Sequence, residues 1–420
     1  MGKTMRREKT KRSKKCPNGT RRNKKTGICQ KNGKSTIRKQ KYNKNIFKPI
    51  KMVSKIIEIK SRTPKSHIEL RESLNYPQES IKINETMKSI TESIYRSFSP
   101  SINKELVTLK SMTPEANIFI CPMGEINVKT TRGYKCKSVY DNSPEIKRMM
   151  LGNLNVKAKK INYDLILSPK QFQSNCWFNV FFMAFFISDK GRKFFRYLRK
   201  AMITGILPNK TSIEADMKMP LFLLNFFIEA SFVGENDPAR FGEVMDTNVL
   251  IQQIGNALKT KNLHYYDVGK SGNPIRFYLN IMRYLNTKPI KMMAVTAELI
   301  NQDLDMFLCD ADKTPDILYL NQPNTRTEEL KTTYIYTIKK HTVKYVLDSA
   351  IVRSQNKEHY SCYITGNKKE YAFDGASFSY LTPFEWKDKI NLDTTWKFQD
   401  QHEEVFDFKT CTVVYFYYRS

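Results

Sequence analysis

A single cysteine, Cys176, stands where the sequence changes from polar to strongly apolar. The residues before it, 171–175, are rich in amide side chains, and the residues after it form the apolar run 177–187. Within that run, apolar residues at 178, 181, 182, 185 and 186 repeat with the period of one helix face. The pattern predicts a helix that begins at Cys176, where the positive end of the helix dipole favours the nucleophilic thiolate. The same pattern also suits a structural cysteine that begins a core helix.

A cysteine nucleophile needs a base within hydrogen-bond reach and a third group that orients the base. Of the five histidines, His359 has the most informative setting, because a polar loop leads into a predicted strand there. Two predicted strands, 360–365 and 370–373, could form a hairpin with Asn367 in its turn. Such a hairpin would bring Asp374 back beside His359. The residues therefore predict a Cys-His-Asp triad, and the alternative is a structural histidine at a strand start.

The elements that must position these residues are helices first and strands afterwards. Apolar periodicity predicts helices over 176–187, 190–200, 221–232, 244–254 and 274–285, the last with a proline in its first turn. Runs of β-branched and aromatic residues predict strands over 316–320, 332–338, 343–347, 349–352, 360–365, 370–373 and 412–418. Helices followed by an antiparallel sheet make an α+β fold.

Several stretches resemble motifs of the ubiquitin-specific proteases, and they occur in the same order along the chain. Residues 176–179, Cys-Trp-Phe-Asn, are similar to the cysteine box of that family, and residues 359–364, His-Tyr-Ser-Cys-Tyr-Ile, are similar to its histidine box. Phe373-Asp374 resembles the dipeptide that supplies the third catalytic residue, and residues 413–419 resemble the closing strand. The matches span residues 165–420. The resemblance implies a papain-like cysteine protease fold, in which a helical lobe with the nucleophile at a helix N-terminus packs on an antiparallel β-sheet lobe.

The resemblance also implies an activity and its residues. It implies a thiol-dependent deubiquitinase, a hydrolase that releases ubiquitin or a ubiquitin-like modifier from proteins through Cys176, His359 and Asp374. Family members place an oxyanion-stabilising Asn five residues before the nucleophile; Gln171 occupies that position here and keeps an amide N–H donor. We expect neither a cofactor nor a metal ion for this reaction.

The sequence departs from the family in three respects. Residues 173–175, Gln-Ser-Asn, lack the glycine that usually precedes the cysteine. No Cys-x-x-Cys pair is present for the zinc site of the family's fingers, and no motif of the Gln-Asp-Ala type is recognisable. Membership is therefore distant, and the substrate does not follow from the fold alone.

The charge is unevenly distributed along the chain. Residues 1–60 contain 22 Lys and Arg against two Glu, so they hold +20 of the formal net charge of +30. We expect residues 1–50 to be a basic disordered arm, because they have too few apolar residues to bury. Residues 51–160 are predicted to be a linker or partly ordered extension, and residues 161–420 the catalytic domain. Residues 1–60 are expected to contact nucleic acid or another polyanion without specificity, and a merely solubilising tail is the alternative.

Two Cys-Pro-x-Gly turns form a separate feature of the sequence. They begin at Cys16 and Cys121, and each is followed by a second cysteine, Cys29 or Cys136. Each pair could close a small loop through a disulfide or a metal ion. A chance similarity between two turns rich in Gly and Pro is the other interpretation.

Nothing in the sequence indicates contact with a membrane. The chain opens on charged residues rather than a signal sequence, and its longest apolar run is too short to cross a bilayer. We therefore expect a soluble intracellular protein. The composition, rich in Lys, Asn and Ile, and the Cys-Pro-x-Gly opening look like proteins of large cytoplasmic DNA viruses, which suggests the host cytoplasm, the virion or the nucleus.

Two other functions stay open on the sequence. One is a viral protein-maturation cysteine protease that cuts at Gly-Gly-like sites, and the other is a non-catalytic basic protein that packages nucleic acid. The order of cysteine before histidine disfavours the adenovirus-type and SUMO-protease class, in which histidine comes first.

Overall fold

A computed structural model describes residues 20–22, 29–31, 56–60, 125–130, 132–138, 144–154, 161–171, 173–233, 247–302, 304, 308, 314–323, 325–338, 341–377, 380–399 and 404–420. The chain divides into two units, Met1–Val53 and Ser54–Ser420. In the first unit, β1 (Thr20–Arg22) and β2 (Cys29–Lys31) pair antiparallel, and Cys29 is disulfide-bonded. Cys16, the partner that the sequence suggests for Cys29, and the rest of the predicted basic arm lie outside the described residues.

The second unit contains one large sheet. Its strands in spatial order are β12 (Thr382–Pro383), β11 (Lys369–Phe373), β10 (Tyr360–Gly366), β9 (His341–Arg353), β14 (Thr412–Arg419), β7 (Ile317–Gln322) and β6 (Met292–Val295), and β8 (Thr333–Ile338) also pairs with β9. The last strand of the chain, β14, therefore lies inside the sheet, between β9 and β7. Its position explains its composition, since Tyr415, Phe416, Tyr417 and Tyr418 are all fully buried.

The sheet differs from the predicted antiparallel sheet in one pair of strands. β6 and β7 are parallel. The chain leaves β6, forms the short helix α12 (Ala297–Asn301) and returns in the same direction, as a parallel pair requires. β6 itself was missed by the sequence prediction, because it is only four residues long and three of them are partly or fully exposed. The two strands predicted at 343–347 and 349–352 are one continuous strand, β9.

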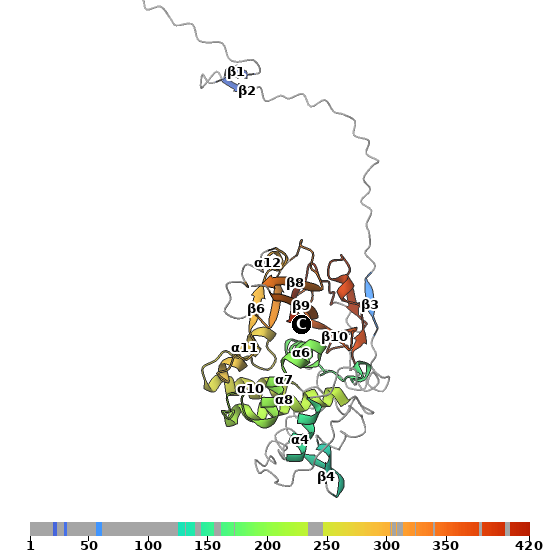
Figure 1. Ribbon diagram of the computed structural model, residues 1–420. Helices are drawn as coiled ribbons and strands as arrows, with labels where there is room; N and C mark the ends of the chain where they lie inside the picture. Colours follow the sequence, from blue (N-terminus) through green and yellow to red (C-terminus); the bar gives the residue numbers. More distant parts are fainter. Residues whose placement is uncertain are drawn as a thin grey trace, which may run out of the picture. The chain divides into compact units, whose positions relative to one another are not determined.

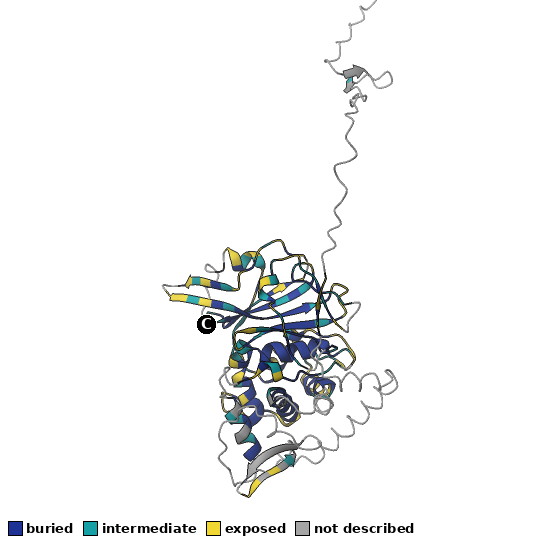
Figure 2. Cartoon of the chain, turned by 90° about the vertical axis from the view of Figure 1, so that its right-hand side faces the viewer, coloured by how far each residue is buried: buried dark blue, intermediate teal, exposed yellow. Residues whose placement is uncertain are grey.

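Helices cover one face of this sheet (Figures 1 and 2). In chain order they are α4 (Pro144–Asn153), the 3-10 helix η4 (Tyr163–Leu165), α5 (Cys176–Phe182), the π-helix η5 (Met183–Ile187), α6 (Asp189–Phe194), α7 (Arg196–Thr204), α8 (Ala215–Val233), α10 (Thr247–Thr260) and α11 (Pro274–Tyr284). The 3-10 helix η6 (Lys387–Lys389) lies between Trp386 and Ile390, which belong to the other core. α11 begins as predicted, because Asn273 caps it and Pro274 occupies its first turn.

Two apolar cores lie on the two faces of the sheet. On the helical face, Phe185 of η5 packs edge to face on Phe416 of β14 with ring centroids 5.3 Å apart. On the opposite face, Tyr415 of β14 packs on Phe408, and Trp396 and Trp386 lie in the same cluster. Because successive side chains of a strand point to opposite faces, β14 contributes aromatic rings to both cores. Figure 2 shows the buried residues concentrated at the sheet and the helices against it.

Several elements from the range 51–160 belong to the second unit. β3 (Ile57–Ile59) pairs in parallel with β13 (Trp396–Phe398), and Ile59 is 4% exposed. From α4, Ile146 and Met150 are fully buried in the helical core. β4 (Glu125–Thr130) and β5 (Gly133–Ser138) form an antiparallel hairpin that contains Cys136, whereas Cys121 lies outside the described residues.

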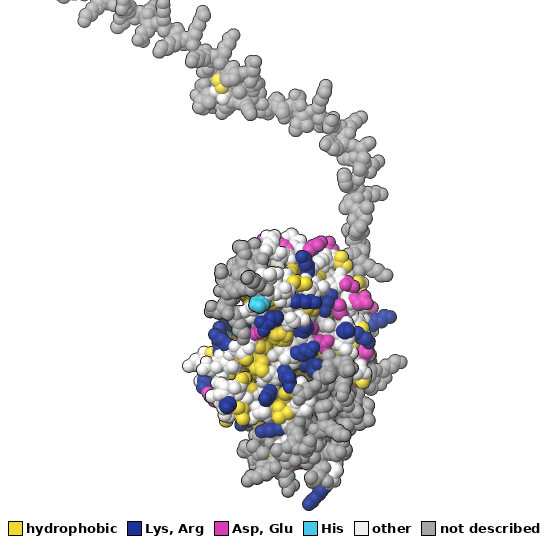
Figure 3. Space-filling view, viewed as in Figure 1, with side chains coloured by type: hydrophobic (Ala, Val, Ile, Leu, Met, Phe, Trp, Pro, Cys, Tyr) yellow, Lys and Arg dark blue, Asp and Glu magenta, His cyan; other side chains and the backbone are white. Residues whose placement is uncertain are grey.

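Two observations bear on contacts with membranes and polyanions. Among the described residues, no helix combines the length and the hydropathy that a membrane crossing requires. On the face drawn in Figure 3, Lys and Arg side chains are interspersed with acidic and apolar ones. The predicted contact with nucleic acid was assigned to residues 1–60, most of which lie outside the described ranges, so it stays a prediction.

Candidate active site

Cys176 is the first residue of α5, as the apolar periodicity predicted. Its side chain is buried, with 7% of the residue exposed, and every residue of α5 is buried. The next residue, Trp177, anchors the start of the helix. The indole Nε1 donates to the carbonyl oxygen of Lys270 over 3.1 Å, and the ring packs on Tyr266 and Phe277. The position of the thiol is therefore determined by the core and not by a mobile loop.

His359 lies at the junction between a tight loop and β10. Its backbone N–H donates to Ser354 Oγ over 3.1 Å, and the backbone N–H of Ser354 donates back to the His359 carbonyl oxygen over 2.8 Å. The imidazole is buried and packs edge to face on Phe406, with ring centroids 6.1 Å apart. Backbone hydrogen bonds and a ring contact thus hold this histidine.

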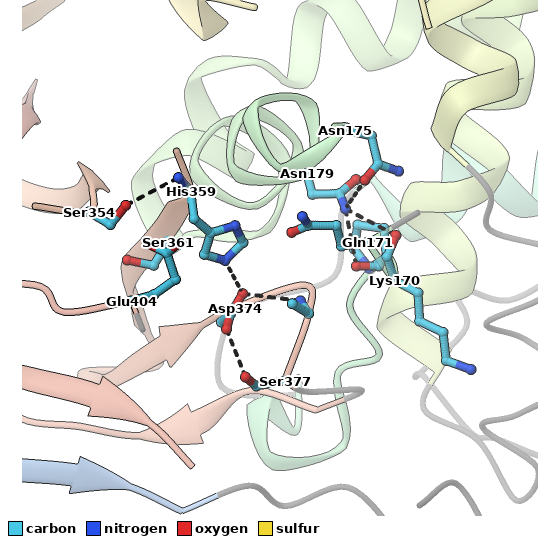
Figure 4. A network of polar contacts seen from close by, with 12 residues as sticks. Lys170, Gln171, Asn175, Asn179, Ser354, His359, Ser361, Asp374, Ser377 and Glu404 are labelled. Carbon is cyan, nitrogen blue, oxygen red and sulfur yellow. Dashed lines mark hydrogen bonds and ion pairs between the residues drawn. The ribbon is translucent and has the colours of Figure 1, made fainter. Parts of the chain in front are cut away.

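The predicted hairpin brings Asp374 to His359. β10 and β11 pair antiparallel with Cys362 opposite Phe373, and Asn367 and Lys368 form the turn with φ values of 47° and 68°. Asp374 follows β11 directly and is fully buried. Its Oδ1 lies 2.6 Å from Nε2 of His359 (Figure 4).

Further donors hold the Asp374 carboxylate in place. Oδ1 also accepts the backbone N–H of Ala376 over 3.0 Å, and Oδ2 accepts the hydroxyl of Ser377 over 2.8 Å. These bonds and the charge of His359 offset the effect of burial and lower the pKa of Asp374 from its usual value. The carboxyl group is therefore ionised at neutral pH.

His359 lies between two groups that favour its protonated form. Burial lowers the pKa of His359, but the charge and hydrogen bond of Asp374 and a hydrogen bond with the Cys176 side chain outweigh it. Together they raise the pKa of His359 to about 10. Since Nε2 faces Asp374, the other ring nitrogen, Nδ1, is left for the contact with Cys176. Cys176, His359 and Asp374 therefore form one continuous chain of contacts.

Gln171 lies beside this chain of contacts. Its backbone N–H donates to the carbonyl oxygen of Gly375 over 2.9 Å, so it is tied to the residue after Asp374. Its side-chain Nε2 donates to the Gln173 carbonyl oxygen over 3.3 Å. An amide nitrogen has two hydrogens, so a second N–H remains for a substrate oxygen. Figure 4 shows Gln171 beside Asn179 and across the site from His359.

Several residues at the site were not singled out as functional from the sequence. Asn175, Asn179 and Thr247 form a buried polar cluster behind Cys176, and Ser377 supports Asp374. Asn179 could have been singled out from the sequence, because it is the last residue of the cysteine-box motif at 176–179. Thr247 lies 68 residues further along the chain, and no local pattern marks it. Of the other histidines, His264 packs on Tyr266, His341 is exposed, and His67 and His402 lie outside the described residues.

The described side chains contain no group of three or more His, Cys, Asp or Glu that could hold a metal ion. The cysteines that the structure describes as free are Cys176, Cys362 and Cys411, and all three are buried. Burial raises the pKa of Cys362 well above its ordinary value and that of Cys411 to about 12. Of these three thiols, Cys176 alone has a histidine among its contacts.

No protein-family model matches the sequence, and no curated protein matches it significantly. Among solved structures, the chain is similar to the SAGA DUB module of Ubp8, Sgf11, Sus1 and Sgf73 bound to ubiquitin aldehyde, with 11% identity, 84% of this chain and 98% of that chain covered, and a TM-score of 0.38. A similar complex bound to monoubiquitin gives 10% identity, coverage of 84% and 99%, and a TM-score of 0.38.

A third neighbour is the apo Pan2 pseudoubiquitin hydrolase-RNA exonuclease module of Saccharomyces cerevisiae. It is 11% identical, with 64% of this chain and 56% of that chain covered and a TM-score of 0.38. By name, these neighbours are deubiquitinase or pseudoubiquitin-hydrolase modules. Because their identity and TM-scores are low, we base no functional assignment on them.

Proposed function

We propose that the chain is a thiol-dependent hydrolase that removes ubiquitin or a ubiquitin-like modifier from proteins. The observation that supports the chemistry is the position of His359. This histidine hydrogen-bonds to the buried carboxylate of Asp374 on one side and contacts Cys176, at the start of a buried helix, on the other. A buried histidine with those two neighbours is the arrangement that activates a cysteine nucleophile.

Each residue has a role in acyl transfer. The Cys176 thiolate attacks the carbonyl carbon of the amide that joins the modifier to its target, and the His359 imidazolium gives its proton to the leaving amine. A thioester with Cys176 remains. Water then attacks the thioester, His359 takes a proton from it, and the modifier leaves with a free carboxylate. Asp374 holds the imidazole in orientation throughout.

Gln171 is proposed to stabilise the oxyanion of the tetrahedral intermediate, together with the backbone N–H of Cys176. The free N–H of its amide and its place beside Asn179 support this role. The substrate class rests on the resemblance of the cysteine and histidine boxes to those of the ubiquitin-specific proteases.

The direct test is covalent labelling by ubiquitin that carries a C-terminal electrophile. We expect labelling of the wild-type protein and none of Cys176→Ala. The matched control is Cys362→Ala, which removes a buried thiol of the neighbouring strand and should leave labelling intact. His359→Ala should lose turnover of a ubiquitin amide substrate; it should melt at a lower temperature, because Asp374 keeps a buried charge without its partner, so its circular dichroism must show that it is still folded at the assay temperature.

The outcomes separate the alternatives. Labelling at another cysteine in Cys176→Ala, or full turnover by His359→Ala, would refute the assigned residues. Reaction with a Gly-Gly peptide electrophile but not with the ubiquitin probe would favour a protein-maturation protease. No reaction of the wild-type protein with either probe would favour a non-catalytic protein.

A further inference from the structure

A buried hydroxyl group connects the two segments that meet at the nucleophile. Thr247 is the first residue of α10 and is fully buried. Its Oγ1 lies 2.9 Å from Nδ2 of Asn175 and 2.6 Å from Oδ1 of Asn179. Asn175 is the residue before Cys176, and Asn179 lies about one helical turn after Cys176.

The chemistry of these three side chains fixes the direction of each bond. Asn175 Nδ2 can only donate, so the Thr247 oxygen accepts from it. Asn179 Oδ1 can only accept, so the Thr247 hydroxyl donates its single proton to it. One hydroxyl group thus makes one bond of each kind, and the amide of Asn179 has a single orientation.

That orientation determines what Asn179 offers to the segment before the nucleophile. With Oδ1 held by Thr247, the NH₂ group of Asn179 faces the carbonyl oxygens of Lys170 and Pro169, at 3.1 Å and 3.5 Å. Figure 4 shows these bonds from Asn179 to the segment that carries Gln171. A reversed amide would set the Asn179 oxygen against two carbonyl oxygens, which repel it.

Gln171 is the next residue, and it is held on its other side as well. Its backbone N–H donates to the Gly375 carbonyl oxygen over 2.9 Å. A Cβ on Gly375 would lie 3.1 Å from Asn179 Nδ2 and 3.3 Å from Gln171 Cβ, so the three groups are in close contact. The backbone at Gln171 is therefore held between the Asn179 amide and the loop after Asp374.

We propose that Thr247 is a positioning residue for the oxyanion-stabilising amide of Gln171, acting through the side chain of Asn179. The proposal rests on the proposed function, since it assigns Thr247 to the same site. A displacement of about 1 Å at the reacting centre can cost about 100-fold in rate, because an oxyanion donor acts only at the correct distance.

The test is a double-mutant cycle between Thr247 and Gln171. Thr247→Val keeps the size of the side chain and removes both hydrogen bonds, whereas Thr247→Ser keeps the hydroxyl. Loss of an oxyanion donor lowers kcat by about 100-fold to 1000-fold, so we expect Thr247→Val to lower kcat by about 10-fold to 100-fold on a fluorogenic ubiquitin amide. KM should change by less than about 3-fold, because the bound ground state makes little use of the oxyanion donor. Thr247→Ser should restore most of kcat, because serine keeps the hydroxyl group that makes both hydrogen bonds.

In a Gln171→Ala background, Thr247→Val should lower kcat by less than about 3-fold, because the group that it positions is gone. Thr260→Val, on the same helix and hydrogen-bonded to the Ala257 carbonyl oxygen, is the matched control and should leave kcat unchanged. An equal loss in both backgrounds would show that Thr247 acts on something other than Gln171 and would overturn the proposal. So would a Thr247→Ser variant as slow as Thr247→Val.

A second readout does not require a ubiquitin substrate. Hydrogen exchange of the Lys170 and Gln171 backbone amides should speed up in Thr247→Val and stay at the wild-type rate in Thr247→Ser. Unchanged exchange in Thr247→Val overturns the positioning role. If the wild-type protein hydrolyses no ubiquitin substrate, the proposed function fails, and the exchange measurement still decides whether Thr247 holds this segment.

Discussion

The backbone N–H of Gln171 donates to the carbonyl oxygen of Gly375 over 2.9 Å, so the segment before Cys176 and the loop after Asp374 are joined directly. Gln171 comes from the helical half of the chain and Gly375 from the sheet half. The bond therefore holds the two halves in register at the point where Cys176, His359 and Asp374 meet. Changes on either side of it should affect the geometry of the site.

Gly375→Ala tests that relationship. The added Cβ would meet Asn179 Nδ2 at 3.1 Å and the backbone nitrogen of Gln171 at 3.3 Å, so one of these groups must move. Overpacking of this kind costs about 1–3 kcal/mol of folding stability. We expect kcat to fall by about 10-fold, because Gln171 is displaced. Steady-state kinetics and urea unfolding measure the two effects. A variant with wild-type kcat would show that the contact of Gly375 with Gln171 and Asn179 does not determine the geometry of the site.

Gln173→Gly should stabilise the protein. Gln173 is exposed and has φ of 56°, in the left-handed region that costs a residue with a side chain about 1–2 kcal/mol. Glycine adopts this conformation without that cost but loses more chain entropy on folding, so we expect a net gain of about 0.5–1 kcal/mol in the free energy of unfolding. The matched control is the neighbour Ser174, whose φ is not positive, and Ser174→Gly should destabilise. Equal destabilisation by both substitutions would show that Gln173 is not strained.

The segment 173–175, which lacks the glycine that the family usually has there, contains Gln173 with its positive φ. Local sequence therefore indicated an unusual backbone at this point. The helix at Cys176, the hairpin between His359 and Asp374 and the start of α11 at Pro274 follow from periodicity and turn chemistry within short windows. Those local patterns were sufficient to bring His359 and Asp374 together.

The remaining features depend on contacts between distant parts of the chain. The bonds from Thr247 to Asn175 and Asn179 span 72 and 68 residues, and the pairing of β3 with β13 joins segments more than 300 residues apart. The parallel pairing of β6 and β7 is set by a crossover and not by the residues of either strand. No propensity or period encodes such pairings, so a single sequence does not predict them.

Asp374→Asn should change the pH dependence of the reaction. Asp374 raises the pKa of His359, which reaches about 10, so its loss should lower that pKa toward the ordinary value of about 6.5. The alkaline limb of kcat/KM, where the imidazolium loses its proton, should then move to lower pH. The measurement is kcat/KM from pH 5 to 11, with the exposed Asp393→Asn as the control. An unmoved alkaline limb would show that Asp374 does not set the charge of His359.

The same shift has a consequence for stability. Because the folded-state pKa of His359 is raised, its contribution to stability is complete below a pH of about 6.5 and is lost as the pH rises through about 10. Asp374→Asn should remove this part of the pH dependence.

Asp348→Asn should alter stability in the acid range. This carboxyl group is buried in β9 and accepts the backbone N–H of Lys190 over 2.9 Å, and burial raises its pKa from 3.8 to about 6. A raised pKa contributes stability that is complete below pH 3.8 and is lost as the pH rises through about 6. The shift corresponds to about 3 kcal/mol. Asparagine does not ionise, so it lacks this loss. The free energy of unfolding of the variant, measured relative to that of the wild type, should therefore increase from pH 4 to pH 7. Urea unfolding at both pH values measures the gain, and a difference that does not change with pH would refute the raised pKa.

Ile59→Ala and Ile57→Ala form a matched pair on one strand of the N-terminal extension. Ile59 is 4% exposed and packs in the second core, whereas Ile57 is 37% exposed. Burial predicts that Ile59→Ala lowers the free energy of unfolding by about 2–4 kcal/mol and that Ile57→Ala lowers it by less than about 1 kcal/mol. Urea unfolding distinguishes the two. Equal and small effects would show that β3 contributes little to the fold.

The effect of Ile59→Ala should extend toward the active site. β3 pairs with β13, Trp396 of β13 forms a bridge with Phe406, and Phe406 packs on the ring of His359 at 6.1 Å. When β3 separates, hydrogen exchange should speed up at the Trp396 amide, which donates to the Phe406 carbonyl oxygen. Because the Ser354–His359 bonds remain, kcat should fall by less than about 10-fold. A complete loss of turnover, with the protein still folded, would instead assign β3 to the catalytic site itself.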